Sequence, residues 1–423
     1  LLILVLIVTT LGSCKTTKNT FLNRNYHSTA TRYNWYYNAK LNFHAGQNKL
    51  QEEHKDDYNQ LLRIYPLGTK KEAQSIAPQM DKALKKCARA ISKHSMLIKG
   101  EERNRWIDDC YLLIGKAYYY KQEYIKAIEA FRLVGRQFQG NISAYESQIW
   151  LLRSFVEEGD LGSAELAIEY IVMDETFPTS LNQPLSLALA DYYLKTEDKI
   201  MAIEELSSAI DLTKKRREKA RYHFLLAQLQ AEEGNYAEAT NLFTKVIRTS
   251  PDYEMVFNAK INRARSFDTS SGGTDEIVKE LKRMLKDDKN AEYLDVIYYG
   301  LAELNKREDK MSLAIQNYTL SVAKSVKNDA QKALSSSVLA DLYYQKQNYR
   351  LAQAYYDTAV AFMNNKHQRF QVAQLRQKTL TDLITNLDVI YEQDSLQRIA
   401  LMPEGERMAF IDNLIRQIEL EEK

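Results

Sequence analysis

Apolar residues recur along the middle of the chain at helical spacing and at one fixed distance. The stretch 124–131 (YIKAIEAF) returns in similar form at 236–243 and 349–356, with weaker copies between them. The place of Ala127 recurs every 37 or 38 residues, at 127, 164, 202, 239, 277, 314 and 352. We call these seven residues the anchors; six are alanine and one is Ile277. Such a constant period predicts a protein built from repeated helical units.

Each repeat has the same internal pattern. An apolar residue beside Gly or Ala, such as Ile114 before Gly115, lies about 13 residues before the anchor, and a large residue such as Phe131 lies four after it. The pattern predicts an amphipathic helix, a short turn and a second helix, whose alanine anchor allows close packing. Pro178 and Pro251 stand where hairpins should end.

This internal pattern resembles the tetratricopeptide repeat, although its period exceeds the usual length of about 34 residues. The resemblance implies an all-α fold, an α-solenoid of TPR-like helical hairpins wound into a right-handed superhelix. We expect the repeats to fill residues 101–364, and two further hairpins to fill residues 28–100, with a break at Pro66, Leu67 and Gly68. C-terminal helices should follow over 365–423, at 366–393 and 404–420, and continue in the natural protein.

Composition supports this reading. Six prolines and 14 glycines in 423 residues are too few for the turns of an all-β fold. Hydrophobic residues make up 45% of the chain, which argues against general disorder. The 28 tyrosines suit repeat positions that need a large, mostly buried side chain with a polar tip. The net charge of +2 offers no electrostatic basis for binding nucleic acid or an anionic membrane.

The first residues are typical of a targeting segment. Residues 1–8 are apolar but too few to span a bilayer, so residues 1–13 read as a trimmed signal peptide. Leu11, Gly12, Ser13 and Cys14 resemble a bacterial lipobox, in which Cys14 would carry lipid as the only covalent group, on a tether over 14–27. An ordinary buried cysteine is the alternative reading. Lys15 and the absence of an acidic cluster after it favour the periplasmic face of the outer membrane, by analogy.

Motifs for catalysis or metal binding are absent from the sequence. There is no C-x-x-C, G-x-S-x-G, Walker P-loop or G-x-G-x-x-G. None of the histidines forms a short-spaced metal pair: His27, His44, His54, His94, His223 and His367. The basic run 214–217 is followed by Glu218 and indicates a solvated turn. We therefore expect no enzyme activity, no cofactor, no metal and no small-molecule substrate.

Two kinds of covalent chemistry remain to be considered. Cys87 and Cys110 could form a disulfide in the periplasm, but two separate buried thiols are the favoured reading, because most cysteine pairs cannot meet the required geometry. Asp394, Ser395 and Leu396 resemble a short O-glycosylation sequon of Bacteroidota, placed in the link between the two C-terminal helices, with Ser395 as the acceptor. Residues 357–359 fit the sequon too but should lie on a helix.

Repeat proteins of this kind bind partners through the concave face, which the first helices line. On our phasing this face mixes charged and aromatic residues, which suits a peptide or protein segment. An ordinary solvated inner face is the competing interpretation. The residues are Lys116, Tyr119, Arg153, Asp191, Lys195, Gln228, Glu303, Asp341 and Tyr344.

Stretches outside the repeats carry a closer resemblance. Residues 19–27 (NTFLNRNYH) and 31–38 (TRYNWYYN) resemble the start of the PorW/SprE lipoproteins, and 57–62 (DYNQLL) and 394–400 (DSLQRIA) fit as well. That family belongs to the type IX secretion and gliding machinery of Bacteroidota. The resemblance implies a non-catalytic scaffold that links the outer-membrane translocon to the periplasmic ring and motor, with protein partners only. Members are longer than this chain.

Three other functions stay open. A lipoprotein of outer-membrane barrel assembly is again a scaffold, normally with fewer repeats. A muralytic enzyme would need a catalytic domain with a Glu in a cleft, which nothing outside the repeats could house. A glycan-binding receptor should show more Trp and Gly-rich loops than three tryptophans and 14 glycines allow.

Overall fold

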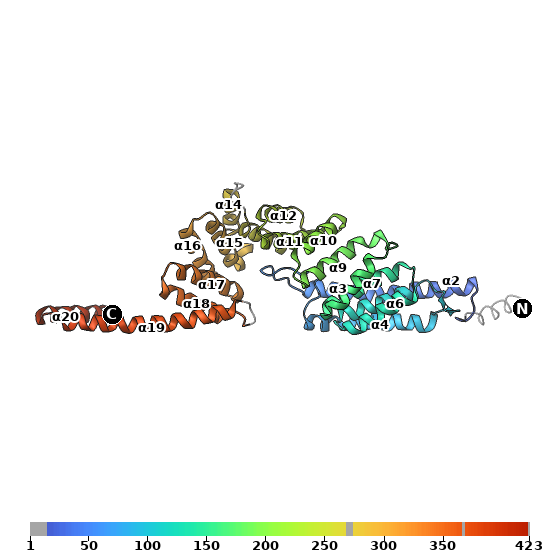
Figure 1. Cartoon of the computed structure of the whole chain (residues 1–423), viewed down its shortest axis with the longest axis horizontal. Coiled ribbons are helices and arrows are strands. Elements are labelled where there is room, and N and C mark those ends of the chain that lie inside the picture. Colours follow the sequence, from blue (N-terminus) through green and yellow to red (C-terminus); the bar gives the residue numbers. More distant parts are fainter. Residues whose placement is uncertain (1–14, 268–273, 366–368, 422–423) are drawn as a thin grey trace, which may run out of the picture. The chain divides into compact units, whose positions relative to one another are not determined.

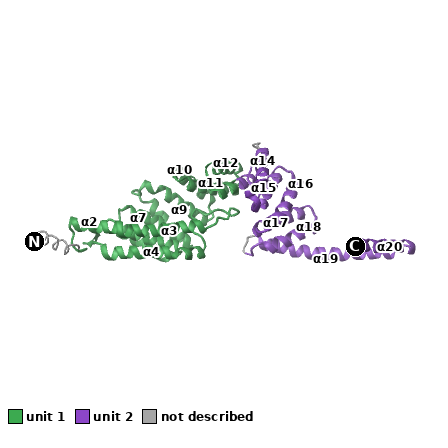
Figure 2. Ribbon diagram, turned by 180° about the vertical axis from the view of Figure 1, so that it is seen from behind, with its two compact units in different colours: residues 1–259 green, residues 260–423 purple. Residues whose placement is uncertain are grey.

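The computed structural model describes residues 15–267, 274–365 and 369–421. Helices make up most of this part of the chain, so the predicted all-α fold is confirmed. The strands among the described residues form a small hairpin, in which β1 (Leu97–Ile98) pairs antiparallel with β2 (Glu101–Glu102). The chain divides into two compact units, Leu1–Ala259 and Lys260–Lys423 (Figure 2).

The first unit begins with a long helical stretch and continues with four helical hairpins. The stretch consists of α2 (Phe21–Ala30), a π-helical turn (Thr31–Tyr36) and α3 (Tyr37–Glu53), and it packs on α4 (Lys70–His94). Residues 28–100 therefore hold one hairpin, α3 with α4, where the sequence predicted two. The repeat hairpins are α5 (Ile107–Tyr120) with α6 (Tyr124–Gln137), α7 (Ile142–Glu158) with α8 (Leu161–Val172), α9 (Asn182–Lys195) with α10 (Lys199–Leu212), and α11 (Arg216–Glu232) with α12 (Tyr236–Thr249) (Figure 1).

The second unit continues the repeats and ends in two long helices. Its hairpins are α13 (Tyr253–Arg265), which begins in the first unit, with α14 (Thr274–Met284), α15 (Leu294–Arg307) with α16 (Met311–Lys324), and α17 (Asp329–Gln345) with α18 (Tyr349–Phe362), followed by α19 (Phe370–Ala400) and α20 (Glu404–Glu421). Asp394 and Ser395 lie inside α19, so their predicted place in a link was wrong. The link is the short stretch before Glu404, where Pro403 cannot continue the helix.

The anchors pack as the sequence pattern predicted. All seven lie in the second helix of their hairpin, and all are buried. Gly115 shows why the first helix needs a small residue opposite: an added Cβ there would stand 2.4 Å from the Phe131 ring. Phe131 lies four residues after its anchor and is itself buried. Small residues on the first helix and large ones on the second thus interlock within a repeat.

The turn inside each hairpin has one conformation. The residue five before the anchor is left-handed, with φ between 59° and 85°, in every repeat where the structure describes it. These residues are Gln122, Gly159, Glu197, Gly234, Asp309 and Gln347. The next residue is the N-cap of the second helix, and where it is Asp160, Asp198 or Asn348 its side chain accepts a backbone N–H of the first turn.

The N-terminal stretch is fastened by a buried polar cluster. His27 Nδ1 and His94 Nδ1 lie 2.9 Å apart, and the Trp35 indole donates to His94 Nε2 over 3.2 Å. The Asn104 amide donates to Thr31 Oγ1 and to the His94 carbonyl oxygen. Burial, and then the His27 charge, lowers the pKa of His94. Two histidines far apart in sequence thus form one structural pair, which the sequence did not reveal.

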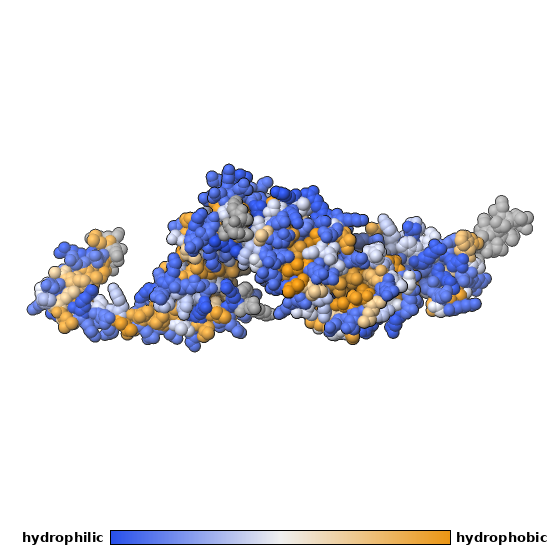
Figure 3. Space-filling view, turned by 45° about the horizontal axis from the view of Figure 1, so that its top comes forward, coloured by the Kyte–Doolittle hydropathy of each residue, from blue (hydrophilic) through white to orange (hydrophobic). Residues whose placement is uncertain are grey.

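The described surface carries both hydrophilic and hydrophobic residues (Figure 3). Hydrophobic residues gather on parts of the first unit that face the viewer in the space-filling view (Figure 3). Among the helices that the structure describes, none is both long and apolar enough to cross a membrane.

Candidate protein-binding surface

Part of the chain between α3 and α4 packs against the first helices of the repeats in the first unit. Residues 54–69, which join α3 to α4, form neither helix nor strand, and we call them the inner segment. In Figure 1 this blue stretch runs as an irregular coil beside the green helices. It contacts α7, α9 and α11, the first helices of three repeats, and the turn after α5.

The backbone of the inner segment is held by side chains of α11. Gln228 accepts the Leu62 N–H over 3.0 Å and donates to the Gln60 carbonyl over 2.7 Å. Arg221 donates to the Arg63 carbonyl, over 3.1 and 2.9 Å, and forms a two-pronged ion pair with Asp56. Farther along, Gln122 donates to the Gly68 carbonyl. These bonds hold the irregular backbone of the segment, and the ion pair with Asp56 adds a side-chain contact.

Apolar side chains of the inner segment complete the core of the repeats. Tyr58, Leu62 and Ile64 are buried in one cluster with residues of α9, α10, α11 and α12. The Tyr58 and Phe224 rings meet edge to face, with centroids 5.1 Å apart. Leu67 joins a second cluster that contains Tyr119. The segment is therefore part of the folded core of this unit.

Arg153 of α7 is a buried cation on this surface. Its guanidinium carbon lies 3.5 Å from the ring centre of Tyr65, 3.9 Å from that of Trp150 and 4.9 Å from that of Tyr119. Burial by itself would lower the pKa of Arg153, but Tyr119 and Tyr65 raise it above its usual range. The aromatic faces replace part of the hydration that the cation loses.

Asp191 of α9 is buried close to this cation without a direct ion pair. Its Oδ2 receives no hydrogen bond from the described residues. Burial, and then the Glu157 charge, raises the pKa of Asp191 to about 6, while Arg153, Arg63 and Lys195 act in the opposite direction. Since most of this effect comes from lost hydration, the carboxyl group is costly to ionise in the folded chain.

The predicted concave-face residues divide into distinct environments. Six of the nine lie eleven residues before an anchor: Lys116, Arg153, Asp191, Gln228, Glu303 and Asp341. Around the inner segment the structure brings together Tyr119, Arg153, Asp191 and Gln228. Lys116 instead pairs with Glu146 at 2.6 Å, and Lys195 is exposed at the end of α9. Their role in binding a partner stays a prediction.

In the second unit the corresponding carboxylates hold tyrosines. The Tyr318 hydroxyl donates to Glu303 over 2.5 Å, and the Tyr356 hydroxyl donates to Asp341. Burial, and then the bond to Asp341, raises the pKa of Tyr356 to about 12. Arg376 of α19 also bonds Asp341 and lies over the Tyr344 ring, which is partly exposed. These two tyrosines thus bury their rings while their hydroxyl groups hydrogen-bond to carboxylates, as expected for tyrosines at repeat positions.

The inner segment itself was missed by the sequence reasoning. It holds six large apolar residues within ten positions, without a helical period and next to Pro66: Tyr58, Leu61, Leu62, Ile64, Tyr65 and Leu67. An apolar run of this kind that fits neither helix nor strand must pack on something else. The sequence therefore indicated that this stretch is buried, although it did not show which helices the stretch packs on.

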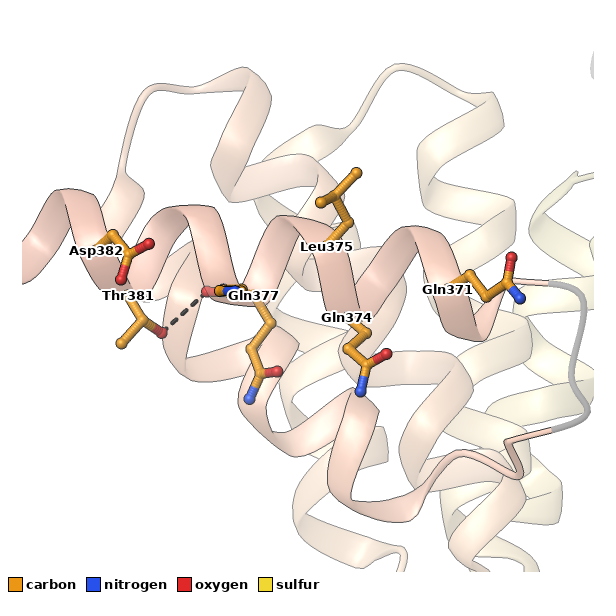
Figure 4. Close-up of a pocket in the computed structure, with 7 residues that line it drawn as sticks. Gln371, Gln374, Leu375, Gln377, Thr381 and Asp382 are labelled. Carbon is orange, nitrogen blue, oxygen red and sulfur yellow. Dashed lines mark hydrogen bonds between the residues drawn. The ribbon is translucent and has the colours of Figure 1, made fainter.

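The hollows and thiols of the described chain offer little for chemistry. A hollow of about 660 Å³ is lined only by residues of α19, among them Gln374, Gln377 and Asp382 (Figure 4). Within the described ranges no three His, Cys, Asp or Glu side chains are grouped to hold a metal. Cys87 and Cys110 are buried free thiols in one cluster, where the hydrogen bond between them and then burial raise the pKa of Cys110. Cys14 lies outside the described residues.

Comparison with known proteins supports the nature of the repeats. Residues 187–254, which include α10, α11 and α12, match the tetratricopeptide-repeat family. The chain contains tetratricopeptide repeats. A search of curated proteins finds no match.

The chain is also similar to solved structures of low sequence identity. The apo form of RapI is 12% identical, with a TM-score of 0.44, over 74% of this chain and 98% of that one. The C-terminal part of a TPR repeat-containing protein from Cytophaga hutchinsonii is 13% identical, with a TM-score of 0.40, over 72% and 99%. The Cut9–Hcn1 assembly of APC/C is 14% identical, with a TM-score of 0.33, over 84% and 66%.

Proposed function

We propose that this protein is a non-catalytic scaffold of the type IX secretion machinery. In this proposal Cys14 carries lipid on the periplasmic face of the outer membrane, and the repeats link the translocon to the periplasmic ring and motor. The protein would support secretion and gliding, and its partners would be proteins. The resemblance of residues 19–38 and 394–400 to the PorW/SprE lipoproteins motivates the secretion role.

The inner segment is the observation that carries the scaffold role. Side chains of α11 bind an irregular polypeptide segment by its backbone, through Gln228 and Arg221. A first helix that already holds a segment of its own chain in this way supports a role in binding protein segments. Because the inner segment occupies that place in the first unit, a partner must bind elsewhere on the chain or displace it.

Lipid labelling tests the anchor. Cells fed a clickable fatty acid should label the wild-type chain, and Cys14→Ala should abolish the label and release the protein from the outer-membrane fraction. Cys87→Ala is the matched control, because that thiol is buried in α4 and should leave labelling unchanged. Equal labelling of Cys14→Ala and wild type would refute the anchoring.

In-cell cross-linking with mass spectrometry tests the partners. We expect subunits of the secretion ring or the translocon among the cross-linked proteins. Recovery of barrel-assembly components alone would favour the alternative, a tetratricopeptide-repeat lipoprotein of outer-membrane barrel assembly. A strain lacking the protein should also lose secretion, and normal secretion in that strain would contradict the proposal.

A further inference from the structure

The outer face of α8 carries an apolar stripe that no described residue covers. Leu166, Tyr170 and Met173 are 67%, 63% and 79% exposed. Their spacing of four and three residues puts them on one side of the helical turn, over about 10 Å of its length. Val172 is exposed beside them. Single exposed apolar residues are common on proteins, whereas a continuous row indicates a contact surface.

Other repeats show that the architecture does not require apolar residues here. The three positions lie two, six and nine residues after the anchor Ala164. In α12 the same positions hold Asn241, Lys245 and Arg248, and in α10 they hold Glu204, Ser208 and Asp211, all of them exposed. The stripe is therefore a property of α8 and not of the repeat.

The hairpin that carries the stripe is strongly acidic. Residues 154–194 contain no Lys or Arg, while the whole chain has 58 basic and 56 acidic residues. The eight acidic residues of this stretch are Glu157, Glu158, Asp160, Glu165, Glu169, Asp174, Glu175 and Asp191. Glu165 and Glu169 lie along one side of the stripe and are exposed.

We propose that the outer face of α8 binds a basic amphipathic helix of a partner protein. The inference rests on the proposed scaffold function and names a kind of partner for it. A helix laid along α8 can set apolar side chains against Leu166, Tyr170 and Met173, which supplies affinity. Its Lys and Arg residues would meet Glu165 and Glu169, which favours basic partners and speeds their association.

The same charges argue against other occupants. A second copy of this chain would bring its own acidic α8 against the first, so like charges would face each other. An anionic lipid surface would be repelled in the same way. A basic helix satisfies both the apolar stripe and the acidic flanks.

Peptide binding to the full chain tests the proposal. The probes are a synthetic 18-residue Leu/Lys amphipathic helix and its Leu/Glu counterpart, measured by fluorescence anisotropy. We expect the Lys helix to bind at least about tenfold more tightly than the Glu helix, and more weakly as salt rises. Equal affinity for the two helices would overturn the proposal.

Surface variants locate the site. Combining Leu166→Asn, Tyr170→Gln and Met173→Gln should weaken Lys-helix binding at least about tenfold, and Glu165→Gln with Glu169→Gln should remove the preference for the Lys helix. All five side chains are exposed, and an unchanged melting curve confirms folding. The control, Asn241→Ala with Lys245→Ala on α12, should bind as wild type does. Unaltered binding by the α8 variants would overturn the proposal.

A photo-crosslinking residue at Tyr170 tests the surface in cells. Mapping the cross-linked segment should reveal Lys and Arg interspersed with apolar residues at helical spacing. A cross-link to a second copy of this chain, to lipid, or to a segment without basic residues would overturn the proposal. The peptide assay needs no secretion machinery, so its failure is distinguishable from failure of the secretion role.

Discussion

At the residue scale, the buried charges of α7 and α9 show how this fold tolerates ions. The Arg153 cation is buried against three aromatic rings, and the inner segment supplies one of them, Tyr65. Asp191 has no comparable set of donors, and its pKa rises to about 6. A cation can thus be buried here against π faces. An ionised carboxylate in the same region has no such partners, so its lost hydration destabilises the folded state.

The pH dependence of stability should report this carboxyl group. The pKa of Asp191 is about 6 in the folded chain against an ordinary 3.8, so the folded state binds the proton more tightly than the unfolded state. Its cost is absent below about pH 4 and complete above about pH 6. Asp191→Asn should therefore raise the free energy of unfolding by about 3 kcal/mol at pH 7 and leave it unchanged near pH 4.

Urea denaturation at a series of pH values measures this difference. Asp211→Asn is the control, since that carboxylate is exposed on α10 and its loss should not alter the profile. A constant difference between Asp191→Asn and wild type from pH 4 to pH 7 would show that ionisation of Asp191 does not carry the effect.

At the element scale, the hairpin is the unit that repeats, and its turn is more uniform than its sequence. Four of the six described turns use Gln122, Glu197, Asp309 or Gln347 in a left-handed conformation that L-residues adopt at a cost. Gly159 and Gly234 adopt it freely. The repeated turn therefore explains why a helical protein with so many hairpins manages with 14 glycines.

Glycine in place of Glu197 should stabilise the protein. Removing Cβ relieves the left-handed strain, and the larger entropy of the unfolded chain offsets part of the gain, which leaves about 1 kcal/mol. Gly234→Ala makes the reverse change in the next repeat and should destabilise by a similar amount. Urea midpoints followed by circular dichroism compare the two variants. If Glu197→Gly denatured at lower urea than wild type, a contact of the Glu197 side chain would outweigh the strain.

Local pattern explains which elements the sequence predicted well. The anchors and the large residues four positions later contact residues of the same or the adjacent hairpin, so one period along the chain encodes them. The helix ends were less predictable. Residues 394 and 395 continue α19, because no strong breaker occurs before Pro403. The pair of His27 and His94 was hidden because it joins positions 67 residues apart.

At the scale of the molecule, the inner segment ties distant parts of the first unit together. The Leu62 N–H bonds a side chain 166 residues away, and the Arg221 side chain reaches back to Asp56. No local pattern in the sequence encodes such a contact. The sequence therefore predicted the first-helix residues of this surface but not the inner segment that packs on them. The apolar residues around Pro66 indicated that this stretch is buried, but they did not indicate which helices it packs on. Contacts of this length also oppose the end-to-end independence of repeats, because they join hairpins that are not neighbours.

Arg221 should control how firmly the inner segment is held. Arg221→Met removes a shielded two-pronged ion pair with Asp56 and two bonds to the Arg63 carbonyl, while it keeps an apolar stem. Asp56 would then have only His54 beside it, at 3.4 Å, and the Arg63 carbonyl would lose its donor, so the free energy of unfolding should fall by about 2 kcal/mol. Hydrogen–deuterium exchange over residues 56–67 should quicken at least about tenfold, most clearly at the Leu62 amide.

The same helix provides the matched control for this change. Arg217 lies one turn earlier on α11, where it forms an exposed ion pair with Asp252 at 3.5 Å. Such pairs contribute little to stability, so Arg217→Met should leave exchange in the inner segment at its wild-type rate. Equal protection of the Leu62 amide in both variants would mean that apolar burial of Tyr58, Leu62 and Ile64 is enough to hold the segment. Faster exchange in Arg221→Met alone would show that α11 grips its backbone, as it would have to grip any polypeptide that takes its place.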